Sequence, residues 1–367
     1  MMRTFRTISR LLLGAVFIFS GFVKGVDPLG TAYRIEDYFV AFHMEWAIPL
    51  SLFLSVILCV SEFTLGIFLI TNIFKKTTAW LTALMMLFFT IVTLNDALFS
   101  PVPDCGCFGD ALILSNWETF FKNIIIDFFL FFVFITRNSY ETPYKKSTEW
   151  SLAILGIASF TLFNSYNLYR LPLIDFRDWK VGKSLVVENP EPIEYYLIYT
   201  NKETQEQQEY LSPNYPYNDS AWLAQWEYTD MRVVDPNPHP NSVSFFDLSG
   251  EDVTADFLQD PFYNFLLISY DLETGSWKNL ETIRYLKQQV ENDGYTFSMI
   301  TSSSEGIIAS FQKEHQFYAD FYQSDDIDLK TIIRSNPGLI LLKNGKILGK
   351  WPHGHLPDYK TITQLKD

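Results

Sequence analysis

The first half of the chain contains apolar segments long enough to cross a lipid bilayer, and this feature limits the possible folds most. A membrane-spanning helix needs about 20 mostly apolar residues, and its backbone polar groups must be satisfied within the helix. We therefore expect an all-α membrane bundle of four to five transmembrane helices. Ser115 and Glu118 have the spacing of a capping box at the start of the fourth. The predicted spans are 11–26 with flanking residues, 46–73, 79–99, 117–135 and 150–168.

The first apolar segment has the form of a signal peptide, because a basic start precedes a short apolar run. However, no small-residue cleavage site follows Gly25, and further apolar segments come later in the chain. We expect an uncleaved helix.

The basic residues of the short loops predict the orientation, since cytoplasmic loops are rich in Lys and Arg. With five spans they all fall on one side, and the loops 27–45 and 101–115 fall on the other, together with everything after Arg170. We expect a bacterial inner-membrane protein with a cytoplasmic N-terminus and a periplasmic C-terminal domain. The basic residues are Arg3, Arg6, Arg10, Lys75, Lys76, Arg137, Lys145 and Lys146.

The net charge of −14 lies entirely in the second half of the chain. Residues 1–172 carry 12 basic and 12 acidic side chains, whereas residues 173–367 carry 16 and 30. An acidic soluble half argues against nucleic acid as a partner, because phosphate binding needs a basic surface. The predicted partners are the lipid bilayer and an envelope protein or client.

Two of the three cysteines form the motif Asp104-Cys-Gly-Cys-Phe-Gly-Asp110 on the predicted outer side. An oxidising compartment permits a disulfide there, and Gly106 and Gly109 supply the backbone freedom that such a loop needs. The neighbouring carboxylates are expected to raise the pKa of a thiol. Three interpretations stay open for Cys105 and Cys107: a redox-active pair, a structural clip and a metal site lacking further ligands.

Polar side chains inside the predicted spans need a reason, because burying them in lipid is costly. Glu62 lies near the middle of the second span, three residues after Cys59. We keep Glu62 as a candidate intramembrane acid, with helix–helix hydrogen bonding as the alternative. We interpret Cys59 as a small buried apolar residue, and Asn95, Asp96 and Asp127 as structural.

Several motifs resemble the DoxX-like/MauE-type membrane family over about residues 5–140. They are Ser20-Gly21-x-x-Lys24-x-x-Asp27-Pro28-x-Gly30, Asp37-Tyr-Phe39, the cysteine loop, and Trp117-Glu-Thr-Phe-x-Lys122-Asn123. The resemblance implies a four-helix core similar to the vitamin K epoxide reductase bundle. It also implies a link to thiol and quinone chemistry and to maturation of methylamine dehydrogenase disulfides. By this resemblance Cys105 and Cys107 are the redox candidates. The additional Cys-x-x-Cys pair of the epoxide reductases is absent, which argues against quinone as a cofactor.

The second half reads as a linker with a small β-rich segment (173–239) followed by an α/β domain (240–367). The exit linker is predicted at 171–182 and the boundary at the prolines of 236–241. Strands are expected at 194–200, 205–211, 264–270 and 295–300, and a hairpin with an Asn344-Gly345 turn at 339–349. The segment 244–254 is expected to form a strand, a turn and the start of a second strand or a helix. Helices are expected at 221–226, 279–292, 305–315 and 328–334.

The order of elements after residue 240, with Ser335-Asn-Pro-Gly338 before the hairpin, resembles the thioredoxin-like superfamily, closest to its redoxin branch. The resemblance implies that Pro337 is cis and faces the position of a dithiol after strand 264–270. The sequence there is Asp271-Leu-Glu-Thr-Gly-Ser-Trp277, without cysteine. We therefore predict that Pro337, Trp277 and Asp271 line a partner-binding groove without dithiol chemistry.

The predicted function is an envelope membrane protein that assists thiol/disulfide handling or maturation of exported proteins, as an accessory to thiol–disulfide oxidoreductase chemistry. The alternative is a non-catalytic scaffold or assembly subunit of a larger envelope complex. A third hypothesis places a small-molecule or quinone site around Glu62. No metal site is expected, because His353 and His355 lack a third ligand in the sequence.

Overall fold

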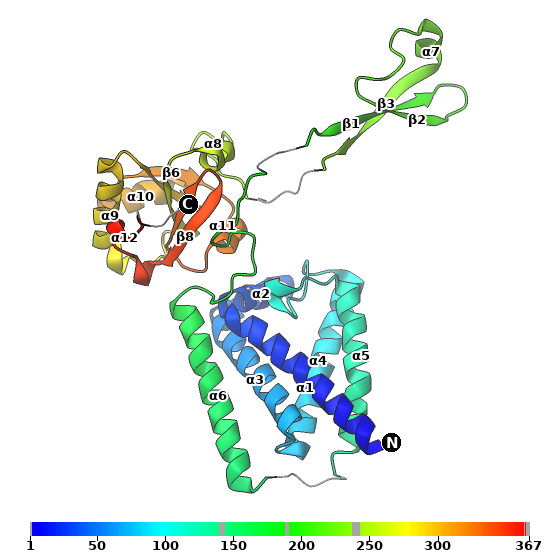
Figure 1. Cartoon of the computed structure of the whole chain (residues 1–367), viewed down its shortest axis with the longest axis vertical. Helices are drawn as coiled ribbons and strands as arrows, with labels where there is room; N and C mark the ends of the chain where they lie inside the picture. The colour runs from blue at the N-terminus through cyan, green and yellow to red at the C-terminus, as the bar shows by residue number, and fades with distance from the viewer. Residues whose placement is uncertain (1, 139–143, 188–190, 237–242, 363, 365–367) are drawn as a thin grey trace.

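The computed structural model describes residues 2–138, 144–187, 191–236, 243–362 and 364. Along the chain they form a helical bundle, a small projecting sheet and an α/β domain that lies at one end of the bundle (Figure 1). We call that end the domain end. The predicted boundary at 236–241 falls almost wholly outside the described residues.

The bundle is formed by long helices that run alternately towards and away from the domain end (Figure 1). Among the described helices, four are long and apolar enough to cross a membrane, and α5 has the length but carries Glu118, Lys122 and Asp127. The capping box of Ser115 and Glu118 at the start of α5 is confirmed. The helices are α1 Met2–Val26, α3 Ser51–Thr71 after a 3-10 turn Glu45–Leu50, α4 Lys75–Phe99, α5 Asn116–Ile135 and α6 Lys146–Tyr169.

The outward-facing surface of the bundle is apolar, as a lipid-facing surface must be. Phe53, Leu84 and Phe131 are each exposed, whereas Leu13, Met86 and Leu130 are buried between α1, α4 and α5. Glycines allow α1 and α3 to approach closely, since a Cβ at Gly21 would lie 2.5 Å from the backbone nitrogen of Phe63. This is the packing that small residues give in membrane helices.

The loop expected at 27–45 contains a helix, α2 Pro28–Ala41, at the domain end of the bundle (Figure 1). Asp27 caps it by accepting a hydrogen bond from the Gly30 N–H (2.9 Å), and Pro28 occupies the first turn. Because the helix is short and mixed in polarity, its periodicity did not separate it from a loop.

The projecting part is a three-stranded antiparallel sheet in the order β2-β1-β3. Its elements are β1 Glu194–Asn201, β2 Gln207–Leu211, the helix α7 Ser220–Gln225 and β3 Trp226–Val234. The sequence predicted β1, β2 and α7 but not β3. Tyr199, in the middle of β1, packs its ring against Trp222 of α7 (4.7 Å between centroids), which gives this sheet a small aromatic core.

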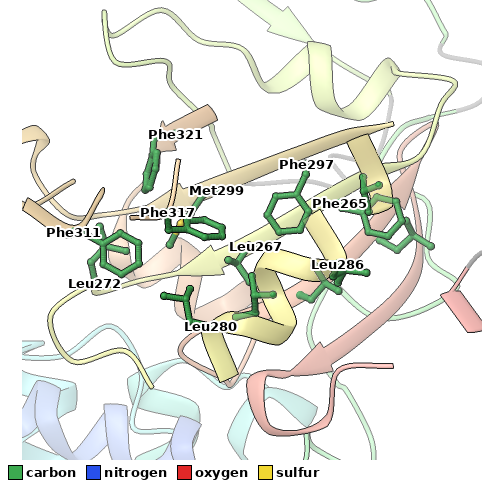
Figure 2. Packing of buried hydrophobic residues seen from close by; sticks show 14 of the residues in the cluster. Phe265, Leu267, Leu272, Leu280, Leu286, Phe297, Met299, Phe311, Phe317 and Phe321 are labelled. Atoms are coloured by element: carbon green, nitrogen blue, oxygen red, sulfur yellow. The ribbon is translucent and has the colours of Figure 1, made fainter. Parts of the chain in front are cut away.

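The α/β domain contains a five-stranded sheet in the order β6-β5-β4-β7-β8, with β4 parallel to β5 and antiparallel to β7. Clusters of buried apolar residues cover both faces, and Figure 2 shows the one that contains Phe265 and Leu286. This order is compatible with a thioredoxin-like domain. The elements are α8 Thr254–Gln259, β4 Asn264–Ser269, α9 Leu280–Asn292, β5 Thr296–Thr301, α10 Glu305–His315, β6 Asp320–Gln323, α11 Asp326–Ile332, β7 Gly338–Lys343, β8 Lys346–Pro352 and α12 Tyr359–Ile362.

The segment predicted as an exit linker is instead packed into the α/β domain. Trp179 is only 1 % exposed and contacts Phe245 with ring centroids 5.9 Å apart. Ser184 forms an isolated β-bridge with Lys346 of β8. Residues 175–186 therefore pack with the α/β domain, because their apolar side chains complete a core formed by strands far along the chain. The division into a linker at 173–239 and a domain from 240 stays a prediction.

Candidate functional site

The cysteine loop lies at the domain end of the bundle, where Cys105 and Cys107 are joined as a disulfide across Gly106. Their Cα atoms are 5.5 Å apart, and both residues are half-buried. Gly106 (φ 61°) and Gly109 (φ 51°) adopt the left-handed conformation that the sequence predicted for this loop. The Gly109 N–H donates a hydrogen bond to the Gly106 carbonyl oxygen (3.0 Å), which closes a tight turn.

The loop is seated on a buried polar cluster inside the bundle, formed by Ser20 and Lys24 of α1 and Glu62 of α3. Lys24 Nζ lies 2.6 Å from Glu62 Oε1, and the two residues are 5 % and 1 % exposed. The Ser20 hydroxyl lies 2.7 Å from Glu62 Oε2 and 2.8 Å from the carbonyl oxygen of Cys107. A buried ion pair thus supports the backbone of the cysteine loop through one serine. We call Ser20, Lys24 and Glu62 the pedestal.

Apolar contacts fix the same loop against the bundle. The ring of Phe108 lies 5.4 Å from that of Phe19 of α1, and Lys122 Nζ of α5 lies 4.4 Å from the Phe108 centroid. Lys122 also belongs to the quoted motif, so the motif residues of α1, the loop and α5 converge here. The sequence does not reveal this convergence, because the three segments are far apart along the chain.

The carboxylates of the loop are paired with arginines. Arg34 of α2 forms an ion pair with Asp104 (2.8 Å), and its Cγ would lie 2.9 Å from a Cβ at Gly106. The Gly106 N–H donates to Asp104 Oδ1 (2.9 Å). The expectation that the neighbouring carboxylates raise the pKa of a thiol does not take this pairing into account, since Arg34 neutralises Asp104.

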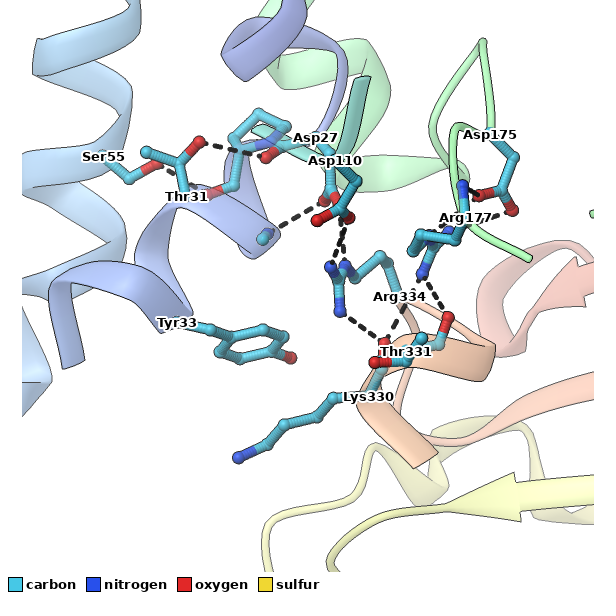
Figure 3. A network of polar contacts seen from close by, with 12 residues as sticks. Asp27, Thr31, Tyr33, Ser55, Asp110, Asp175, Arg177, Lys330, Thr331 and Arg334 are labelled. Atoms are coloured by element: carbon cyan, nitrogen blue, oxygen red, sulfur yellow. Dashed lines mark hydrogen bonds and ion pairs between the residues drawn. The ribbon is translucent and has the colours of Figure 1, made fainter. Parts of the chain in front are cut away.

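Arg334, just after α11, connects the α/β domain to the bundle (Figure 3). Its guanidinium lies 2.8 Å from Asp27 and 3.4 Å from Asp110, and its side chain is 7 % exposed. Burial alone raises the pKa of Asp27, but Arg334, Arg177 and the Gly30 N–H together lower it below its ordinary value. Burial raises the pKa of Asp110, although Arg334 opposes this. Asp110 follows Cys107 by three residues, so the junction begins directly after the cysteine loop.

A second contact at the junction joins Tyr33 of α2 to Tyr270, with the hydroxyl oxygens 3.2 Å apart. Lys330 Nζ and the Arg334 guanidinium lie 5.0 and 5.2 Å from the Tyr33 centroid. Tyr270 directly follows β4. The end of β4, after which the resemblance places a dithiol, therefore faces the bundle.

Polar contacts also fix the chain segment that enters the α/β domain. Asp175 forms ion pairs with Arg177 (2.8 Å) and with Lys350 of β8 (2.7 Å), and Arg177 donates to the Thr331 carbonyl oxygen (3.0 Å). Burial raises the pKa of Asp175, but these two cations lower it below its ordinary value. Burial lowers the pKa of Lys350 to about 8.

The residues of the predicted groove lie close together, and the Asn336–Pro337 peptide bond is cis as the resemblance implied. Asn336 connects the two segments, because its side chain donates to the Asp271 carbonyl oxygen (2.7 Å). Trp277 is turned inward against Phe311 (4.6 Å), and Asp271 accepts a hydrogen bond from the Glu273 N–H (2.8 Å). A groove for a partner at this place stays a prediction.

The remaining candidates make no described hydrogen bond or ion pair with the pedestal or the cysteine loop. Cys59 is a free, fully buried thiol. His353 Nδ1 lies 3.1 Å from the Ser335 hydroxyl, whose hydrogen is directed at the Pro337 carbonyl oxygen, so the contact is structural. Within the described ranges, no three His, Cys, Asp or Glu side chains are grouped as a metal site would require.

Sequence reasoning named Cys105, Cys107 and Glu62 as candidates. It missed the contacts of Ser20 and Lys24 with Glu62 and the pairing of Arg334 with Asp27 and Asp110. Lys24 was quoted only as part of a motif. The sequence did contain a signal for the Lys24–Glu62 pair. A lysine within an apolar span needs an acidic partner at a similar depth in the membrane, and Glu62 of α3 is such a residue. Arg334 gave no such signal, because nothing in its local sequence indicates a contact 307 residues away.

A comparison with protein families matches residues 2–136 to the family described as methylamine utilisation protein MauE. No curated protein matches the chain. The matched range contains α1 to α5, the pedestal and the cysteine loop, whereas α6, the projecting sheet and the α/β domain lie beyond it. Residues 2–136 are therefore similar to the MauE family, as part of a membrane-embedded helical bundle.

Proposed function

We propose that this chain is a cell-envelope membrane protein that exchanges disulfides with exported client proteins through Cys105 and Cys107. The observation that carries the proposal is the position of the disulfide, which is half-buried at the end of the bundle that faces a soluble domain. The similarity to a family named for methylamine utilisation is in keeping with a role in maturation of other proteins. In this proposal the α/β domain, whose strand order is compatible with a thioredoxin-like fold, binds the client, and since it contains no cysteine it takes no part in the exchange itself.

The exchange needs only the loop and the client thiols. A client thiolate attacks one loop sulfur, the Cys105–Cys107 bond breaks, and a mixed disulfide forms while the other loop sulfur leaves as a thiolate. A second client thiol then displaces the loop, which takes up two electrons as the client disulfide forms. The pedestal contributes by positioning the Cys107 backbone, and Glu62 acts there as a positioning residue.

Replacing one loop cysteine is expected to trap the client. Cys105→Ser and Cys107→Ser should each accumulate a mixed disulfide that the double variant lacks. In the reverse of the exchange above, the remaining loop thiolate attacks a client disulfide, the other client sulfur leaves as a thiolate, and the second loop thiol that would resolve the mixed disulfide is missing. The measurement is an alkylation mass shift in native membranes, with and without reductant. Cys59→Ser is the matched control and should behave as the wild type, since this thiol is buried.

Two results would count against the exchange proposal. One is a loop disulfide that no reductant opens in membranes. The other is a double variant that supports client disulfides at the wild-type level. A stable partner that co-purifies equally well with the double variant would favour the scaffold function instead.

A further inference from the structure

A cavity of about 750 Å³ lies at the junction between the bundle and the α/β domain. Its walls are formed by residues of α2, of the loop 101–110, of the segment 172–178, and of the helix α11 together with Arg334 just after it. Ligand sites occur preferentially at domain junctions, and their usual size is about 300–1,000 Å³. This space is too small for a folded protein and suits a short extended segment.

The cysteine loop forms one wall of this junction cavity. Gly106 and Gly109, which flank Cys107, both line it. Gly106 lies between the two cysteines in the chain, and the cysteines themselves are not among the described residues that line the cavity. Both cysteines are half-buried and not sealed in the core. A segment that enters the cavity therefore reaches the backbone of the loop between the two cysteines.

The charges of the cavity favour a cationic occupant. Among the described residues that line it, six are acidic and four are basic. All four basic residues already contact carboxylates: Arg34, Arg177, Lys330 and Arg334. Glu36 of α2 has no described ion pair. Burial raises the pKa of Glu36, and the nearby Lys330 partly opposes this rise. The surplus carboxylate is available to a positive side chain of a ligand.

We propose that the junction cavity is the entry site for an extended client segment that carries a cysteine next to a basic residue. The inference rests on the proposed function and adds the substrate class to it. The client thiolate attacks a loop sulfur from the side of Gly106, while the basic side chain pairs with Glu36. The bond made is the mixed disulfide, the bond broken is Cys105–Cys107, and the leaving thiolate takes a proton from water.

Narrowing the cavity should slow the reaction of the loop disulfide with peptide thiols but not with small thiols. The probes are 2-mercaptoethanol and two short synthetic peptides with one central cysteine, flanked by arginine in one and by glutamate in the other. The reaction is followed on the full-length protein in detergent, by alkylation of the opened loop. Val40→Trp narrows the cavity, since Val40 is among the residues described as lining it. Val233→Trp on β3 is the control, because Val233 is equally exposed (50 %, against 52 % for Val40) and does not line the cavity as described.

We expect Val40→Trp to lower the rate with the arginine peptide by about tenfold and the rate with 2-mercaptoethanol by less than about twofold, since access and not chemistry changes. The wild type should prefer the arginine peptide, and Glu36→Gln should remove that preference. If both variants react with the peptides as the wild type does while 2-mercaptoethanol opens the loop, the cavity is not the entry site and the exchange function stands. If 2-mercaptoethanol does not open the wild-type loop, the proposed function itself fails.

Discussion

Replacing Arg334 with leucine is expected to release the α/β domain from the bundle. Arg334 is 7 % exposed and is the described cation that contacts both Asp27 and Asp110. Its removal leaves two carboxylates at a buried junction without their partner, and breaking a buried ion pair in this way costs about 3–5 kcal/mol. Limited proteolysis of the segment 171–178 in detergent should show faster cleavage, because that segment joins α6 to the α/β domain and lines the junction that Arg334 holds together.

The effect should be specific for the buried pair. Arg232→Leu is the matched control, since Arg232 also pairs with a carboxylate, Glu209 (2.6 Å), but on the exposed projecting sheet. Solvent and salt screen exposed pairs, so they contribute little to stability, and this variant should be cleaved like the wild type. Adding Asp27→Asn to Arg334→Leu should restore part of the docking by removing the buried charge. Equal cleavage of the wild type and Arg334→Leu would show that the domain is attached by other contacts.

Replacing Lys24 with methionine is expected to destabilise the bundle strongly. Glu62 would then be a carboxylate buried to 1 % exposure without its cation, a change that costs about 3–5 kcal/mol. The double variant Lys24→Met/Glu62→Met should recover most of this stability, since a buried ion pair can be replaced by apolar side chains of similar size at little cost. Thermal unfolding in detergent measures both effects.

The double variant also separates a positioning role from a purely structural one. Ser20 loses both partners that fix its hydroxyl against the Cys107 carbonyl oxygen. We therefore expect a stable protein whose loop disulfide exchanges with 2-mercaptoethanol at a clearly altered rate. Asp127→Asn is the control, because Asp127 accepts a hydrogen bond from the Thr90 hydroxyl of α4 (2.7 Å) and not from the pedestal, and its replacement should cost only about 1 kcal/mol. An unchanged exchange rate in the stable double variant would mean that the pair serves packing alone.

The membrane half illustrates which features a sequence predicts well. Spans were predicted because α1, α3, α4 and α6 are long and apolar, and this is a local property. The boundaries of α5 and its capping box follow equally from neighbouring residues. The short helix α2 and the strand β3 were missed, since neither has a clear apolar period of its own. Trp179 was placed in a linker because its burial depends on Phe245, which lies 66 positions further along the chain.

The sequence by itself determined the membrane bundle, the alternating β and α elements of the second half, and the cysteine pair with its two turn-forming glycines. These follow from the length of apolar runs, from periodicity and from conformational preference, all of which act between near neighbours. Only the tertiary structure decided that Glu62 pairs with Lys24 under the cysteine loop, that Arg334 joins the domain to Asp27 and Asp110, and that a cavity borders Gly106. Those features depend on contacts between residues far apart in the chain, and long-range contacts exist only once the helices and the sheet have packed.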